Sequence, residues 1–128
     1  MISQNAKILL QRVVKTLLLK RIMAYDFGAL EASVAAAVGD DDALAQDLRR
    51  AFLDGVRHHA DLLNRSRCDA NWEVAAHRLK GLAGSFGAVA LMKTADFALE
   101  SVPGDPVALR RVKSAIAAIA GEGDGTLL

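Results

Sequence analysis

The sequence lacks the features of several large protein classes. It has one cysteine, Cys68, which cannot form an intramolecular disulfide and cannot supply a multi-cysteine zinc site. Its 16 basic and 15 acidic residues leave a net charge of +1, too little for the overall field that draws proteins to nucleic acid. The longest apolar runs, 34–38 and 115–120, fall far short of the ~20 residues that cross a bilayer. We therefore expect a soluble, cytoplasmic protein that binds no nucleic acid and makes no stable membrane association.

Aromatic residues are also scarce. They make up 5% of the chain although 52% of it is hydrophobic, so the apolar content comes mainly from alanine, leucine, valine and isoleucine. Alanine and leucine favour helices, whereas strands favour β-branched and aromatic residues. No segment alternates apolar and polar residues with a period of two, and no Asn-Gly hairpin turn occurs. A chain of 128 residues is long enough for one core, so the composition predicts a single all-α domain.

Glycine, proline and aspartate divide the chain into predicted helices. Gly39 ends one of them, and an N-cap followed by proline at 105–106 starts the last. Each of four helices begins at an aspartate that can cap it, namely Asp26, one of the run 40–42, Asp69 and Asp105. The predicted helices cover 1–22, 27–38, 42–65, 70–86, 88–102 and 106–120.

The short loops between these amphipathic helices predict antiparallel neighbours. We expect an antiparallel up-and-down four-helix bundle within residues 24–120, with additional N-terminal helices before it. Three glycines in 121–128 predict a flexible tail.

Residues 1–23 form a predicted basic amphipathic helix. Its apolar residues recur at helical spacing, and it has basic residues but no acidic one. Packing onto the bundle or onto a second copy is the favoured role, with membrane-surface contact or targeting as the alternative. For the whole chain we expect a monomer rather than a dimer.

The predicted helix over 70–86 has one apolar face. On a helical wheel Trp72, Leu79 and Phe86 fall within a sector about 120° wide, the usual size of a core-facing stripe. His77 lies on the opposite side. A lone histidine on an apolar face is usually a core residue, but this position predicts exposure to solvent.

Two glycines follow the histidine at one and two turns. Each glycine inside a helix costs about 1 kcal/mol relative to alanine, so Gly81 and Gly84 need an explanation. They remove side-chain bulk beside His77 and would let another protein approach. Close helix packing or a nearby helix end is the alternative. An exposed imidazole with Lys80 one turn away suggests a nucleophile that meets an anionic group on a partner.

Residues 76–91 read AHRLKGLAGSFGAVAL. This run resembles the signature of histidine-containing phosphotransfer (HPt) domains, A-H-x-L-K-G-x-x-x-x-x-G-A-x-x-L. The match includes the alanine before the histidine, the later Gly-Ala pair at 87–88 and the final leucine. The resemblance extends more loosely over 25–120.

The resemblance implies a four-helix bundle that carries a phosphoryl group between the receiver domains of response regulators. His77 would accept the group, and Lys80 would neutralise its charge. Gly81, Gly84 and Ser85 would form the surface on which the receiver docks. The implied partners are receiver domains and a hybrid histidine kinase.

The resemblance also implies that the chain binds no cofactor or metal, since the Mg²⁺ of this chemistry belongs to the receiver. No ATP-binding glycine motif is visible, so we expect a phosphoryl carrier and not a kinase. Family members often place a glutamine or glutamate on the following helix to hold the imidazole. Glu100 is displaced by one position, and we leave it outside the site.

Two other functions stay open. The first is a module that docks on a receiver or kinase without being phosphorylated, and the second is a purely structural helical bundle. A metal site is not expected. His58 and His59 point about 100° apart on one helix, and the aspartates 40–42 fit a helix start better than a metal.

Overall fold

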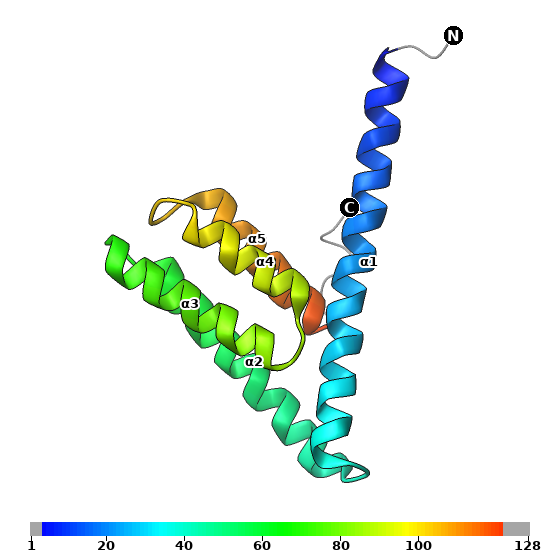
Figure 1. Ribbon diagram of the computed structural model, residues 1–128, viewed down its shortest axis with the longest axis vertical. Helices are drawn as coiled ribbons and strands as arrows, with labels where there is room; N and C mark the ends of the chain where they lie inside the picture. The colour runs from blue at the N-terminus through cyan, green and yellow to red at the C-terminus, as the bar shows by residue number, and fades with distance from the viewer. Residues whose placement is uncertain (1–3, 122–128) are drawn as a thin grey trace.

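A computed structural model describes residues 4–121, with side chains described outside 15–24. This part of the chain consists of α-helices and short connections, with no strand, and the all-α class is confirmed. Residues 1–3, and the expected tail from residue 122 on, lie outside the described residues. The helices are α1 (Gln4–Val38), α2 (Asp42–Arg65), α3 (Asp69–Ser85), α4 (Val89–Leu99) and α5 (Pro106–Ile119) (Figure 1).

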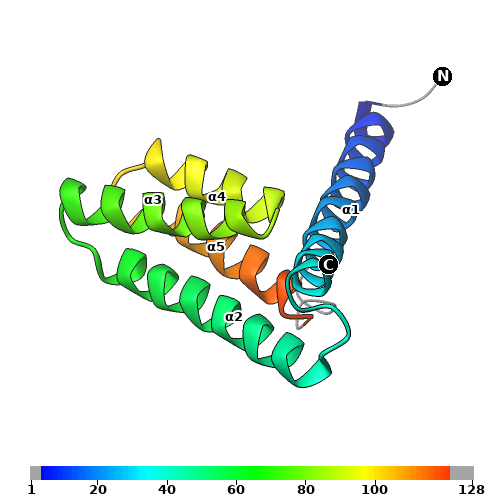
Figure 2. The ribbon, with the colours of Figure 1, turned by 60° about the horizontal axis from the view of Figure 1, so that its bottom comes forward.

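Helices α2 to α5 form the bundle. Each packs against the next, and α5 packs back against α2 to close the ring. Successive helices run in opposite directions (Figure 2), so the expected antiparallel up-and-down four-helix bundle is confirmed. Helix α1 lies against one end of the bundle, where it contacts α2, α4 and α5, and its N-terminal half projects beyond the bundle.

Small residues let the four helices come close together. Eight of the buried core residues on α3, α4 and α5 are alanines, and the large buried side chains are mostly leucine and valine. Gly55 on α2 lies close against α3, since a Cβ atom there would lie 2.8 Å from Leu82 Cδ2. The indole of Trp72 on α3 is buried and donates a hydrogen bond to the carbonyl oxygen of Ala98 on α4 at 2.6 Å. Alanine therefore serves packing as well as helix propensity.

Helix α1 is continuous, which corrects the expectation of two N-terminal helices over 1–22 and 27–38. The helix runs from Gln4 to Val38, and Gly39, with a φ of 64°, ends it. Residues 23–27 contain no glycine or proline that could stop a helix, and Gly28 is accommodated inside it. The expected N-cap, Asp26, does not cap its own helix.

Asp26 instead caps α4 from a distance. Its side chain is 1% exposed, and its two carboxylate oxygens accept hydrogen bonds from the backbone N–H groups of Ala90 and Leu91, each at 3.0 Å. These groups belong to the first turn of α4, whose own N-cap residue, Ala88, has no side-chain acceptor. The carboxylate therefore satisfies two otherwise unpaired donors and places a negative charge at the positive end of the helix dipole.

The other predicted caps divide into two confirmed and one wrong. Asp41 accepts a hydrogen bond from Leu44 N at the start of α2, and Asp105 accepts one from Ala108 N at the start of α5. Asp69 is not an N-cap, because Cys68 occupies that position without a side-chain hydrogen bond. Asp69 lies in the first turn of α3, where its charge still favours the helix dipole.

Two further contacts hold the C-terminal half of α1 in place. The Ser33 hydroxyl donates to the carbonyl oxygen of Phe86, just after α3, at 3.1 Å. Glu31 accepts two hydrogen bonds from the Arg49 guanidinium on α2, both at 2.7 Å. With Asp26, these contacts attach α1 to α2, to α4 and to the connection between α3 and α4.

Replacing Asp26 with alanine should destabilise the fold strongly. The variant leaves two buried N–H groups without an acceptor, which costs about 2–4 kcal/mol of unfolding free energy. Asp41→Ala, which removes an exposed cap, is the matched control and should cost about 1 kcal/mol. Urea denaturation of the three proteins measures both. Equal losses in the two variants would contradict the role assigned to Asp26.

Candidate functional site

Helix α3 has a buried face and an exposed face. Trp72, Ala75, Ala76, Leu79 and Ala83 are at most 4% exposed and face the core. On the other side, His77, Gly81, Gly84 and Ser85 are exposed, and Lys80 is half-buried. All five predicted site residues therefore lie on successive turns of one helix.

The motif over 76–91 likewise contains buried positions and exposed positions. Ala76, Leu79, Ala88 and Leu91 have no exposed surface, so these four motif positions serve the core. Gly87 has a φ of 70°, and the hydrogen bonds Ala88 N to Ala83 O and Gly87 N to Gly84 O end α3 in a Schellman motif. The motif positions that remain for chemistry on the surface are His77, Lys80 and Gly81.

His77 stands in the middle of α3 with its imidazole free. No other residue of the described part of the chain hydrogen-bonds or forms an ion pair with it. Helix α1 covers α2, α4 and α5 but does not contact α3 within residues 4–121. A neutral imidazole has a lone pair on one ring nitrogen, so the side chain can act as a nucleophile toward a group brought from solvent.

Lys80 connects the site to α4. Its ammonium nitrogen lies 2.7 Å from Oδ1 of Asp96, and the two side chains are 39% and 50% exposed. An ion pair at this exposure contributes little stability, at most about 1 kcal/mol. This ion pair holds the lysine near the exposed face of α3, and it is weak enough for another anion to replace Asp96.

Gly81 and Gly84 differ in their surroundings. A Cβ atom at Gly81 would meet nothing within 4 Å, whereas one at Gly84 would lie 3.6 Å from Cε of Met92 on α4. Gly81 therefore borders open solvent, and Gly84 lies beside α4. The Ser85 hydroxyl donates to the Gly81 carbonyl oxygen at 3.0 Å, so in this structure its proton is used within the helix.

Glu100 and the other two histidines lie apart from this arrangement. Glu100 is the exposed C-cap of α4 and has no hydrogen bond to His77 among the described residues. His58 is exposed on α2, and His59 beside it is partly buried, with an Nδ1 atom that has no hydrogen-bond partner in the described structure. Burial lowers the pKa of His59, and the nearby His58 and Arg78 lower that pKa further. His77 and His58 are exposed, whereas His59 is not.

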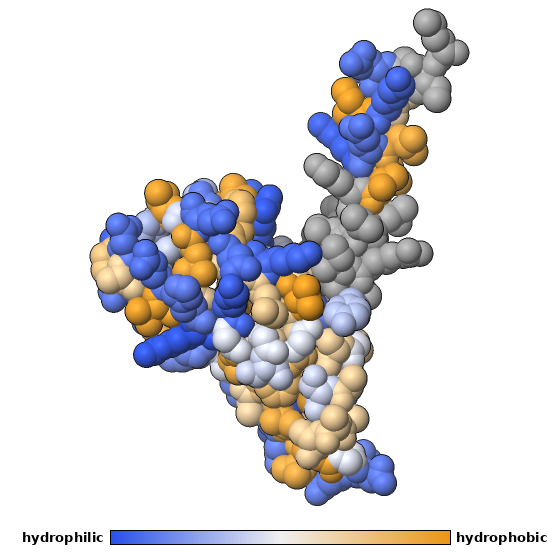
Figure 3. Space-filling view, viewed as in Figure 1, coloured by the Kyte–Doolittle hydropathy of each residue, from blue (hydrophilic) through white to orange (hydrophobic). Residues whose placement is uncertain are grey.

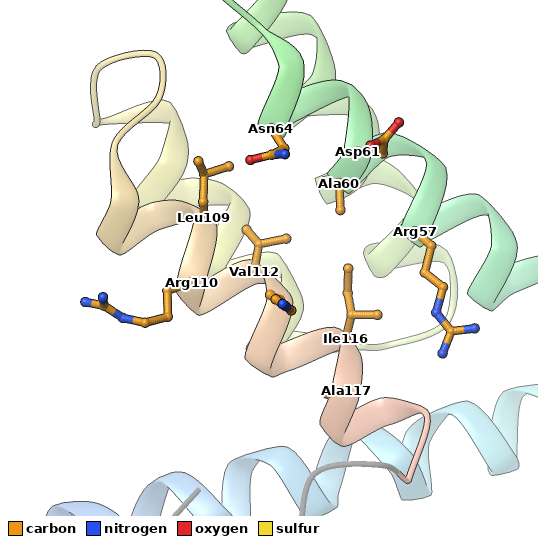
Figure 4. Close-up of a pocket in the computed structure, with 10 residues that line it drawn as sticks. Arg57, Ala60, Asp61, Asn64, Leu109, Arg110, Val112, Ile116 and Ala117 are labelled. Atoms are coloured by element: carbon orange, nitrogen blue, oxygen red, sulfur yellow. The ribbon is translucent and has the colours of Figure 1, made fainter. Parts of the chain in front are cut away.

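Two grooves on the surface do not include the predicted site. One lies between α2 and α5, with Arg57 and Asp61 on one wall and Val112 and Ile116 at its floor (Figure 4). The other is lined by Ser66 and Arg78, among others, near the α2–α3 connection. Within residues 4–121, no group of three or more histidine, cysteine or acidic side chains could hold a metal ion.

Sequence reasoning missed Asp96, the ion-pair partner of Lys80. It lies on the next helix, and nothing in the local sequence around either residue indicates that they meet. No family model, curated protein or solved structure matches the chain. The candidate site therefore rests on its residues and their geometry.

Replacing Gly81 with alanine should stabilise the protein. The added methyl group has open space and alanine is the better helix former, so the unfolding free energy should rise by about 0.5–1 kcal/mol. Gly28→Ala on α1, where a Cβ atom also meets nothing within 4 Å, is the matched control and should gain a similar amount. Urea denaturation measures both changes. A loss of stability at Gly81 alone would show that the glycine is needed for the fold.

Proposed function

We propose that this protein is a histidine phosphotransfer protein of a multistep phosphorelay. In this role it is a cytoplasmic carrier without kinase activity of its own. His77 takes a phosphoryl group from the aspartyl phosphate of one response-regulator receiver domain and passes it to another receiver. A hybrid histidine kinase is the source of the phosphoryl group.

The observation that carries the proposal is the free imidazole of His77 on the bare face of α3. The exposed side chain has neither an intramolecular hydrogen bond nor an ion pair within the described structure, and Gly81 leaves the surface one turn away open. The motif resemblance over 76–91 supports the same residue. A histidine that served only the fold would be expected on the buried side of the helix, with its ring nitrogens hydrogen-bonded.

The transfer needs little from the acceptor except position and charge. The lone pair of the unprotonated His77 nitrogen attacks phosphorus, and the P–O bond to the receiver aspartate breaks as the N–P bond forms. The bonding electrons leave with the aspartate, which becomes a free carboxylate. The receiver supplies Mg²⁺, and the reverse sequence on a second receiver empties His77 again.

Lys80 would stabilise the phosphoryl group on His77. The lysine is one helical turn from the histidine, and its ammonium group can exchange the Asp96 carboxylate for phosphoryl oxygens. The pair with Asp96 keeps the lysine extended toward α4 while His77 is unmodified. The same carboxylate repels the incoming anion, so Asp96 would lower the fraction of the protein that is phosphorylated at equilibrium.

The acceptor assignment is tested by replacing His77 with glutamine. The wild-type protein, mixed with purified receiver domains charged by acetyl phosphate, should gain the mass of one phosphoryl group in an acid-labile form. His77→Gln should gain none, because its amide has no nucleophilic nitrogen. His58→Gln, an exposed histidine on α2, is the matched control and should behave as the wild type.

Intact-protein mass spectrometry at neutral and acid pH provides the measurement. An adduct that persists in His77→Gln would refute the site. A wild-type protein that binds a receiver yet gains no phosphoryl group from any receiver of the panel would favour a docking module instead.

Asp96→Asn should increase the phosphorylated fraction of the protein at equilibrium with a charged receiver by about two- to fivefold. The change removes a negative charge near the site and releases Lys80 from its present partner. Lys80→Ala should lower the same fraction. Asp61→Asn, which breaks an ion pair with Arg65 on α2, is the control and should change nothing. Equal fractions in all four proteins would remove Lys80 from the proposal.

A further inference from the structure

The N-terminal half of α1 projects beyond the bundle and exposes large apolar side chains. Leu9, Leu10, Val13 and Val14 are 52–63% exposed, and Ile8 is 46% exposed. The other exposed large apolar residues of the described surface lie singly or in pairs along the chain, so they form no comparable cluster. No helix within residues 4–121 is both long and apolar enough to cross a membrane.

The apolar stripe of this half points away from the protein's own bundle. In the C-terminal half of α1, Leu30 and Val34 face the bundle together with Asp26. At about 100° per residue, a stripe of Leu10, Val13 and Val14 is centred roughly 150° from that direction. Ile8 and Leu9 are not part of this stripe, because they lie about 40° and 60° from the bundle-facing direction. Figure 3 shows hydrophobic side chains along the outer edge of the projecting half. The bundle cannot cover this stripe.

The charge of this segment is strongly one-sided. Residues 1–25 contain five basic residues and no acidic one, while the rest of the chain carries the remaining 11 basic residues and all 15 acidic residues. On the helical wheel Lys7 lies at the edge of the apolar stripe, next to Val14, and Arg12 lies on the opposite side of the helix. An apolar stripe on a segment whose charged residues are all cations favours the interface of an anionic bilayer.

We propose that the N-terminal half of α1 binds the surface of membranes that contain anionic phospholipid. The apolar stripe enters the headgroup boundary, and the net positive charge of the segment attracts the anionic surface. The bundle then lies on the side of α1 away from the bilayer. Because α3 does not contact α1 in the described structure, the exposed face of α3 stays accessible.

A second copy of the chain fits this stripe less well. The described stripe covers fewer than two heptads, whereas a stable coiled coil needs about three or more. Self-association would also bring two segments with five basic residues each, and no acidic one, into contact. Packing onto the bundle or onto a second copy is the role expected from the sequence, but the outward direction of the stripe favours membrane contact instead.

Vesicle co-sedimentation of the full chain tests the proposal. The protein should bind phosphatidylcholine vesicles containing about one-third phosphatidylglycerol at least about tenfold more tightly than pure phosphatidylcholine vesicles. Binding should weaken in about 0.5 M NaCl. Leu10→Glu should weaken it by about tenfold or more, because it places a negative charge in the stripe.

Val102→Glu is the matched control, since it makes the same kind of change at a 71% exposed valine outside α1. It should bind as the wild type does, and far-UV circular dichroism should show both variants folded. Equal binding to neutral and anionic vesicles, no binding to either, or equal binding by Leu10→Glu would overturn the proposal. A dimer in analytical ultracentrifugation that Leu10→Glu dissociates, with no vesicle binding, would assign the stripe to a second copy.

Discussion

The contact between Asp26 and the first turn of α4 is the interaction on which the site depends. A carboxylate 1% exposed, with both oxygens bonded to backbone N–H groups, fixes where α4 begins relative to α1. Helix α4 then supplies Asp96 to Lys80 and Met92 to Gly84. One polar contact in the interior thus determines what stands beside the exposed face of α3.

The sequence predicted those features that are local. The period of 3.6 residues was enough to assign Trp72 and Leu79 to the core, and a cap next to its helix, as at Asp105, was visible in the chain. It did not predict contacts between residues far apart. Asp26 bonds to residues 64 and 65 positions away, on a helix that the local sequence around Asp26 does not indicate. Nor did the sequence predict the ion pair between Lys80 and Asp96.

Within the motif over 76–91, the residues that pack the core are not the residues proposed to carry the chemistry. Ala76 and Leu79 are buried against the neighbouring helices, and Gly87 ends α3 through its positive φ, so a bundle of this kind needs them whatever its function. Helix packing gives no such reason for an open glycine at position 81 or for a free imidazole at His77. The proposed phosphotransfer accounts for this second group. The proposed lipid contact uses α1, which leaves that face of α3 uncovered.

The most direct test of the account is an NMR experiment on the three histidines of the chain. Protein labelled with ¹⁵N in its imidazoles is followed while it reacts with charged receiver domains. The account predicts that the ring signals of His77 alone move to those of a phosphohistidine, and return when an uncharged second receiver is added. Phosphohistidine signals from His58 or His59, or three unchanged imidazoles with every receiver tested, would contradict it.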